Sequence, residues 1–380
     1  MRAPFVVAAI VAIVIAKPAD AQARPDSAGF VTRLGADTLA LERFVRTGRV
    51  VEADVVLRVP RTVRTRYRLE LNPGGELERM ESVSADRREV IVRSGDSLRV
   101  ETTAEGRSRV TTVAAERATL PFIDMIHWPY ELAVLRHRAA RVDSAALPLL
   151  TGTRVTSFGL ASVGSDSVTI THPLRGTMRA RLDRDGRLLG LDAGATTRKL
   201  IVERRPWMPL DSTAGQWVAL DAAGRSVGAL SGRGEAKGTI GAATYVIDYG
   251  TPAKRGRDIW GALVPWGQLW RTGANLATHL TTDHELVLGR GRDTLVMPAG
   301  KYTLYTIPAP DGGVLIVNRQ TGQGGTTYDA ARDLGRVPLS ARPLAGPVES
   351  FTIVTGQSGA AGEIRLQWDR TELVVPVRAR

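Results

Sequence analysis

The sequence predicts a mainly β protein of two domains, an N-terminal antiparallel β-sheet domain with one covering helix and a C-terminal β-sandwich or jelly-roll-like domain. Three observations predict this. Apolar and polar residues alternate with period two over much of residues 30–205. Glycine, proline, asparagine and aspartate separate the alternating segments. From residue 227 onward, short alternating segments with glycine or proline turns carry clustered aromatic residues, which is typical of a sandwich.

Two hairpins give the clearest strand signal in the N-terminal domain, which we expect over residues 24–205. Residues 67–83 place an Asn-Pro-Gly-Gly turn between two alternating segments. Residues 177–191 repeat the layout around an Asp-Arg-Asp-Gly turn. The similarity indicates a meander, although two copies are too few for a repeat architecture.

One segment, residues 120–138, departs from the alternation because its apolar residues recur at steps of three and four. This spacing predicts a helix, or two short helices kinked at Pro129, that covers one face of the sheet. Asp124 and Glu131 lie seven residues apart, so they would share one side of that helix. We expect them to be exposed surface acids, with a glycosidase pair as the less favoured alternative.

Residues 206–226 are predicted to be a junction between the domains. Prolines, an Asp-Ser-Thr run and Gly215 interrupt the periodicity. Trp207 and Trp217 indicate that the junction is at least partly packed, because a flexible tether would seldom carry two tryptophans.

Residues 1–23 have the pattern of a secretory signal peptide. Arg2 precedes an apolar run of 12 residues, and Ala21 and Ala23 supply the small-x-small cleavage pattern. A transmembrane helix needs roughly 20 apolar residues. We therefore expect cleavage after Ala23, no membrane anchor afterwards, and a soluble mature protein in the periplasm or outside the cell. The absence of cysteine excludes a lipoprotein and disulfide bonds.

Composition narrows the classes of function. The chain has a formal charge of +12, but its basic residues are interspersed with acids, and no run of five like charges occurs. The sequence therefore predicts no nucleic-acid partner. Without cysteine there is no thiolate metal site and no cysteine nucleophile.

The C-terminal domain, expected over residues 227–380, contains a distinctive series of motifs. The series comprises Tyr-Gly-Thr-Pro at 249–252, Arg-Gly-Arg at 255–257, Ile-Trp-Gly-Ala-Leu-Val-Pro-Trp-Gly at 259–267, Leu-Trp-Arg-Thr-Gly-Ala-Asn at 269–275 and Met-Pro-Ala-Gly-Lys-Tyr-Thr-Leu-Tyr-Thr-Ile-Pro at 297–308. Together these resemble the bacterial family DUF2911, a domain of unknown function. The family has no catalytic assignment, so the resemblance identifies the domain but implies no mechanism for it. Residues 320–325 depart from the more aromatic loop that the family carries.

Candidate ligand-binding residues come from these motifs. Arg271 has the planar fork that holds a carboxylate or phosphate, and Asn275 would add a directional amide. The alternative is structural, with Arg271 paired to an internal acid and Asn275 fixing a turn. Tyr249 and Arg257, from the same series, complete this part of the set.

Lys301 and Tyr305 share one face of a predicted strand. That face would be either the polar floor of a pocket or a solvated surface. The tryptophans of the domain are expected to be core residues rather than a stacking platform for sugars.

Two histidines of the C-terminal domain lie five residues apart. That spacing suits neither a strand nor a helix metal pair, and a third ligand is missing, so we predict no metal. His279 and His284 are expected to be exposed residues, and His279 is the better candidate for a site.

The function predicted first is that of a non-catalytic ligand-binding or envelope-associated protein without a cofactor. Its ligand would be small and polar, or lipid-like, because a sheet covered by one helix is similar in architecture to periplasmic lipid-carrier half-barrels. A structural interaction module is the second hypothesis. A hydrolase with a polar pocket formed by His279, Lys301 and Tyr305 is the third.

Overall fold

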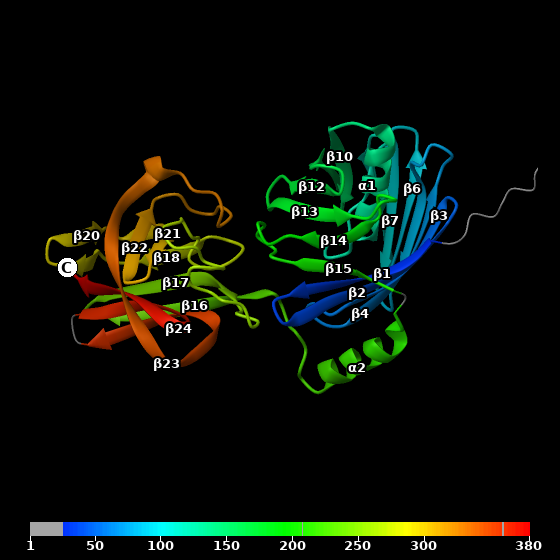
Figure 1. Ribbon diagram of the computed structural model, residues 1–380. Helices are drawn as coiled ribbons and strands as arrows, with labels where there is room; N and C mark the ends of the chain where they lie inside the picture. The colour runs from blue at the N-terminus through cyan, green and yellow to red at the C-terminus, as the bar shows by residue number, and fades with distance from the viewer. Residues whose placement is uncertain (1–25, 207, 359–360) are drawn as a thin grey trace, which may run out of the picture.

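The computed structural model describes residues 26–206, 208–358 and 361–380. Within them the chain forms two β-sheets, each with its own hydrophobic core, that lie side by side (Figure 1). The predicted mainly β fold is therefore confirmed. The predicted signal peptide lies outside the described residues. None of the described helices has both the length and the apolar character needed to cross a membrane.

The N-terminal sheet joins fifteen strands of the described chain in the order β8-β7-β6-β5-β4-β3-β2-β1-β15-β14-β13-β12-β11-β10-β9. The strands are β1 (Asp26–Leu34), β2 (Asp37–Thr47), β3 (Val50–Leu57), β4 (Val63–Leu71), β5 (Leu77–Val83), β6 (Arg87–Ser94), β7 (Ser97–Ala104), β8 (Arg107–Ala114), β9 (Leu120–Pro121), β10 (Ser144–Thr151), β11 (Arg154–Ser162), β12 (Ser167–His172), β13 (Gly176–Leu182), β14 (Leu188–Asp192) and β15 (Ile201–Arg205). Both predicted hairpins are present as β4–β5 and β13–β14.

This sheet curves around the helix α1 (Trp128–Ala140), whose side chains enter the core on the concave face (Figure 1). Trp128 is 1% exposed and Val134 is fully buried. The two faces of the sheet follow from the alternation along each strand. On β1, for example, Phe30 joins the core around α1, whereas its neighbour Val31 packs on the opposite face.

The prediction of a helix over residues 120–138 is wrong at its beginning. Residues 120–121 form β9, which pairs in parallel with β10, and α1 begins only at Trp128. Pro129 stands in the first turn of the helix, where its missing N–H group leaves no helical hydrogen bond unmade, so it starts the helix rather than kinking it. The apolar spacing upstream reflects a buried loop instead.

The predicted junction contains a second helix, α2 (Leu210–Ala222), which the sequence did not predict. Leu210, Ala214 and Trp217 lie on one side of α2 and pack against Val31 and other residues of the outer face of the sheet. Their spacing of four and three is helical, but the surrounding prolines and Gly215 concealed it. Trp217 is buried as predicted, whereas Trp207 lies outside the described residues.

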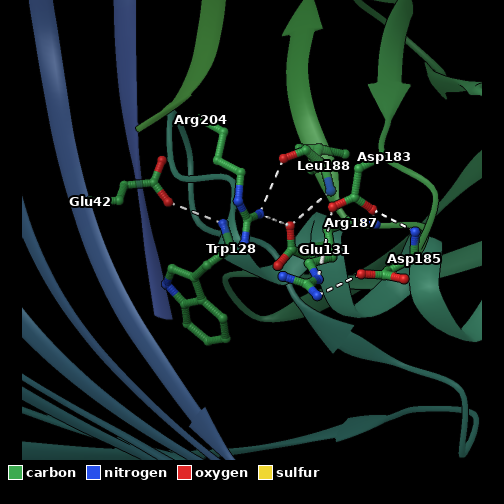
Figure 2. A network of polar contacts seen from close by, with 8 residues as sticks. All are labelled: Glu42, Trp128, Glu131, Asp183, Asp185, Arg187, Leu188 and Arg204. Carbon is green, nitrogen blue, oxygen red and sulfur yellow. Dashed lines mark hydrogen bonds and ion pairs between the residues drawn. The ribbon is translucent and has the colours of Figure 1, made fainter. Parts of the chain in front are cut away.

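Two buried carboxylates fix α1 inside the sheet (Figure 2). Glu42 of β2 is fully buried and accepts hydrogen bonds from the backbone N–H groups of His127 and Trp128, at 2.8 and 3.0 Å. Glu42, although it belongs to β2, therefore caps the N-terminus of α1, because it satisfies N–H groups that have no partner within the helix. Glu131 accepts from Arg204 at 2.5 Å and from the backbone N–H group of Leu188 at 2.9 Å. The expected exposure of Glu131 is wrong, because only 2% of this residue is exposed.

The C-terminal sheet joins nine strands of the described chain in the order β16-β17-β18-β21-β22-β23-β24-β19-β20. The strands are β16 (Ser231–Ile240), β17 (Ala243–Pro252), β18 (Thr278–Thr282), β19 (Leu286–Arg290), β20 (Asp293–Met297), β21 (Gly300–Ala309), β22 (Gly312–Asn318), β23 (Asp333–Ser358) and β24 (Ala361–Ala379), with a short 3₁₀ helix η1 (Ala330–Arg332) before β23.

The sandwich arises because this one sheet folds over on itself. The long strands β23 and β24 bend where their register shifts, between Pro343 and Thr352, so their two ends belong to different layers. Phe351 and Trp368, from these strands, pack against Tyr245 and Leu304 of the other layer within one core.

We predict that Glu131→Gln destabilises the N-terminal domain by about 3 kcal/mol, because it breaks the ion pair between the buried Glu131 carboxylate and Arg204. Asp185→Asn is the matched control, since Asp185 is exposed and pairs with Arg187 at 2.7 Å in the same network (Figure 2). It should cost less than about 1 kcal/mol. Urea unfolding of the purified variants measures both, and equal effects would contradict the prediction.

Candidate functional site

A cavity of about 540 Å³ lies between the two domains, and both contribute to its wall. Residues of the loop between β14 and β15 and of the loop between β17 and β18 both line it. Five cationic side chains line the cavity, and none of the described lining residues is acidic. The cations are Arg175, Arg198, Lys199, Arg257 and Arg271. The volume is that of a small-molecule site.

The two domains meet where the β1–β2 turn touches the segment around Arg255. Ala36 donates a backbone hydrogen bond to the carbonyl of Arg255 at 2.9 Å, and the Arg255 guanidinium donates to Asp37 at 2.6 Å. Gly35 has φ +58°, and a Cβ atom there would lie 2.1 Å from the Arg255 carbonyl oxygen. The turn therefore requires glycine both for its conformation and for the close approach. On the other side, the carboxylate of Glu349, in β23, accepts a hydrogen bond from the backbone N–H group of Arg255 at 2.8 Å.

The Trp-Arg-Thr-Gly-Ala-Asn segment at 270–275 forms one wall, and its backbone is held on both sides. Trp270 and Thr306 of β21 exchange backbone hydrogen bonds of 2.7 and 2.9 Å. Thr278 donates to the carbonyl of Thr272 at 2.6 Å. Thr272 has φ +50°, which a β-branched residue rarely adopts, so the surrounding contacts impose this conformation. Thr272 and Thr278 are therefore structural, and they fix where Arg271 projects.

Arg271 reaches the cavity without a carboxylate partner in the described part of the chain. Its Nε donates a long hydrogen bond of 3.4 Å to the carbonyl of Gly273. Gly325 covers its stem so closely that a Cβ atom there would lie 2.7 Å from the Arg271 Cδ. Burial lowers the pKa of Arg271, but a guanidinium stays charged at neutral pH. The alternative hypothesis, that Arg271 pairs with an internal acid, is therefore wrong for the described residues.

Lys199, from the N-terminal domain, and Arg257, from the C-terminal domain, bring two further charges to the cavity. Burial lowers the pKa of the Lys199 ammonium, and the nearby Arg257 and Arg271 lower it further. Arg257 donates to the backbone carbonyls of Lys254 and Ala253, at 2.9 and 2.5 Å. Among the described residues, neither cation forms an ion pair. Like charges held together away from water favour binding of an anion between them.

Arg175 and Arg198 differ from the other three cations because they share one acid. Asp124 accepts from Arg175 at 2.8 Å and also pairs with Arg198. One carboxylate between two guanidinium groups leaves a net positive charge at this end of the cavity. The expectation that Asp124 lies on a helix is wrong, since it precedes α1 and holds these two arginines.

Aromatic rings line the cavity beside the cations. Trp270 stacks on Trp368 with ring centroids 6.0 Å apart, and Trp260 stacks on Trp266 at the same distance. Trp368 is 1% exposed, as expected of a core residue, yet it and Trp270 also line the cavity. The core prediction is therefore right for Trp368, while the cluster extends to the cavity surface.

The cavity brings together four of the seven candidate residues predicted from the sequence, which are Arg257, Arg271, Asn275 and Tyr305. Asn275 is exposed at the rim, with φ +63°. Its backbone carbonyl accepts from Gly325, so it also fixes a turn, as the structural alternative proposes. Tyr305 is 1% exposed and donates from its hydroxyl group to the carbonyl of Thr327. Burial raises the pKa of Tyr305.

The other three candidates do not line the cavity. Tyr249 is a core residue of the sandwich. Lys301 is exposed on β21, at the end that pairs with Thr281. His279 accepts a hydrogen bond from the backbone N–H group of Gly322 at 3.1 Å. The expected exposure of His279 is wrong, because β18 lies between β17 and β21 and leaves it 7% exposed.

Sequence reasoning missed the contribution of the N-terminal domain to the cavity. Arg175, Arg198 and Lys199 lie in connections between strands, where no periodicity marks a side chain as inward-facing. The adjacent basic pair Arg198–Lys199 in a chain with few lysines was the available signal. Within the described residues, no three histidine or acidic side chains are arranged to hold a metal ion.

Comparisons with known proteins identify part of the chain. Residues 231–377 match the model of DUF2911, described as a protein of unknown function, which confirms the resemblance over this segment. No curated protein matches the chain. Among solved structures, a DUF1089 family protein from Pseudomonas aeruginosa is similar over 41% of this chain and 90% of that chain, with 11% identity and a TM-score of 0.32.

We predict that Lys199→Met stabilises the unliganded protein by about 0.5 kcal/mol at pH 7, because it removes a charge that burial and two arginines disfavour. The folded pKa of Lys199 is lowered, so the penalty is complete below that pKa. It shrinks as pH rises and is lost above the unfolded value of about 10.4. The advantage of the variant should therefore fade at alkaline pH.

Thermal unfolding of wild type and variant between pH 7 and pH 10 measures this difference. Lys237→Met is the control, because Lys237 is exposed and pairs with Glu235 at 2.9 Å. A stabilisation that is the same for both variants would contradict the assignment.

Proposed function

We propose that this protein is an exported, non-catalytic binding protein that holds a small ligand with an anionic group in the cavity between its domains. One observation carries the proposal. Lys199, Arg257 and Arg271 converge from two domains on one cavity, and no ion pair joins any of them to an acid within the described residues.

An anion would relieve the electrostatic cost of this arrangement. Burial and like-charge repulsion both disfavour the charged forms, as the lowered pKa of Lys199 indicates. A carboxylate or phosphate among the three cations would accept charge-assisted hydrogen bonds, and Arg271 has the geometry to donate two of them. Perturbed cations in a concave site support a binding function rather than a purely structural one.

The rest of the wall supports an apolar or flat portion in the ligand. Trp270, Trp368, Leu263 and Val264 line the cavity beside the cations. Aromatic rings provide contact area with little loss of side-chain entropy. The ligand would touch both domains, so its binding would also stabilise their mutual arrangement.

The geometry gives no support to the hydrolase alternative. Its three candidate residues were His279, Lys301 and Tyr305, and only Tyr305 of these lines the cavity. His279 accepts its hydrogen bond beneath the 320–325 loop, and Lys301 faces solvent. These three side chains therefore do not converge on one cleft, as a catalytic base, nucleophile and cation would have to do.

Isothermal titration calorimetry with benzoate, phenyl phosphate and neutral benzamide tests the binding proposal. We expect the two anions to bind, benzamide not to bind, and the affinity for the anions to fall with added salt. Arg271→Met should weaken binding about 10- to 100-fold, since a hydrogen bond to a charged group contributes roughly 1.5–3 kcal/mol.

Arg290→Met is the matched control for Arg271→Met. Arg290 is in the same domain, its side chain is 76% exposed, and its nearest acid lies 3.9 Å away. Equal loss of binding in both variants would indicate a general charge effect and overturn the cavity assignment. Equal binding of benzamide and benzoate would overturn the anion preference.

Export is tested by expressing the full chain with its first 23 residues and measuring the mass and N-terminal sequence of the product. We expect a mature protein that begins at Arg24, because Ala21 and Ala23 present small side chains to a signal peptidase. Ala23→Phe should block cleavage, and Gln22→Phe is the control. An uncleaved wild-type chain found in the cytoplasm would contradict the proposal.

A further inference from the structure

The interdomain cavity continues into the concave interior of the N-terminal sheet. A small hollow of about 30 Å³ adjoins it and shares Arg175, Thr196 and Arg198 with the cavity wall. A groove of about 300 Å³ follows on the concave face and shares Phe122 and Asp124 with the hollow. The three spaces therefore lie end to end, from the cations between the domains to the inner face of β4–β6.

The hollow is apolar although its entrance is charged. Its wall includes Ile123, Met125, Met178, Leu191 and Leu200. His172 also lines it, and burial lowers the pKa of this histidine to about 4, so its ring is neutral at neutral pH. No charged group faces the hollow in the described chain except those at the entrance, namely Asp124, Arg175 and Arg198.

A short segment, residues 123–125, separates the hollow from the groove, and we refer to it as the strap. Its ends are firmly held, since Phe122 donates to the carbonyl of Leu150 at 3.0 Å and His127 donates to Glu42. Between these anchors, the contacts to other segments are the Asp124 ion pairs and a 3.4 Å hydrogen bond from Thr32 to the Met125 carbonyl.

The strap also stores backbone strain. Met125 has φ +65°, a conformation that residues with side chains adopt at a cost of about 1–2 kcal/mol. Strained residues of this kind concentrate in ligand clamps and moving segments. The polar contacts of the strap to other segments are mainly the ion pairs of Asp124 with Arg175 and Arg198, while the Met125 side chain packs in the core.

We propose that the ligand of the cavity is an amphiphile with an anionic head and one unbranched alkyl chain. This rests on the proposed function and specifies its ligand. The head is bound by the cations between the domains, and the chain passes under the strap into the apolar hollow and the groove. An anionic head competes with Asp124 for Arg175 and Arg198, which frees the strap and admits the chain. Charge at the entrance matches the head, and the apolar wall of the hollow matches the chain. The groove beyond offers Tyr67, Met80 and Ile91, although its wall also carries Arg87 and Glu89.

The methionines of the chain provide reporters along this path. Met125 and Met178 line the hollow, and Met80 lines the groove. Met297 lies in the core of the C-terminal sandwich, and Met208 packs on the outer face beside α2, so both are internal controls. The wild-type protein labelled with ¹³C at the methionine methyl groups can therefore be titrated without any substitution in the path.

The probes are butyl phosphate, dodecyl phosphate and dodecanoate, each below its micelle concentration. We expect all three to bind and the two dodecyl compounds to bind at least tenfold more tightly than butyl phosphate. The dodecyl compounds should shift the methyl signals of Met125 and Met178. Butyl phosphate should shift Met125, because its head also frees the strap, and should leave Met178 unchanged. Comparison of dodecyl phosphate with dodecanoate identifies the preferred head.

The outcomes separate this inference from the proposed function. If butyl phosphate binds but the longer chain adds no affinity and does not shift Met178, the amphiphile proposal is wrong while anion binding stands. If no anion binds, the proposed function itself fails. Shifts of equal size at Met208 and Met297 would indicate general detergent action and would also overturn the proposal.

A variant that fills the hollow gives a second test. Ala193 lines the hollow but not the cavity, and Ala193→Leu should reduce dodecyl phosphate binding about tenfold while butyl phosphate binding is unchanged. An equal loss for both probes would contradict a chain path through the hollow. The titration of the wild-type protein decides the question if this variant does not fold.

Discussion

The contact between the β1–β2 turn and Arg255 determines how the two domains face each other. The turn approaches the Arg255 carbonyl so closely that a side chain at Gly35 would collide with it, and Asp37 accepts from the guanidinium on the far side. Arg255 is in turn tied to β23 through Glu349. Because the cavity wall comes from both domains, this one contact sets the distance between the cations of the N-terminal loop and those of the C-terminal motif.

That arrangement has an electrostatic consequence. Lys199 comes from one domain, and Arg257 and Arg271 come from the other, so docking of the domains brings like charges together in a partly dehydrated space. Folding of either domain alone would not create this repulsion. Docking of the domains therefore carries a local electrostatic cost, and an anion bound among these cations would offset it.

The sequence predicted the strands well and the helices poorly, for a physical reason. Alternation on β4–β5 and β13–β14 is visible because one face of each strand is buried and the other is not. The helix α1 is buried on several sides within a curved sheet, so its polar residues Glu131 and His137 are internal and blur the helical pattern. The helix α2 lies among prolines and turn residues that resemble a linker.

The sequence by itself determined the mainly β class, the two hairpins and the C-terminal motif series from which Arg257, Arg271, Asn275 and Tyr305 were chosen. Only the tertiary structure decided that these four lie at an interface between domains and that Tyr249, His279 and Lys301 do not. The difference arises because local pattern encodes which face of a strand is buried. The proximity of Lys199 to Arg271 depends instead on how the two sheets dock. Periodicity within a short segment carries no information about that docking.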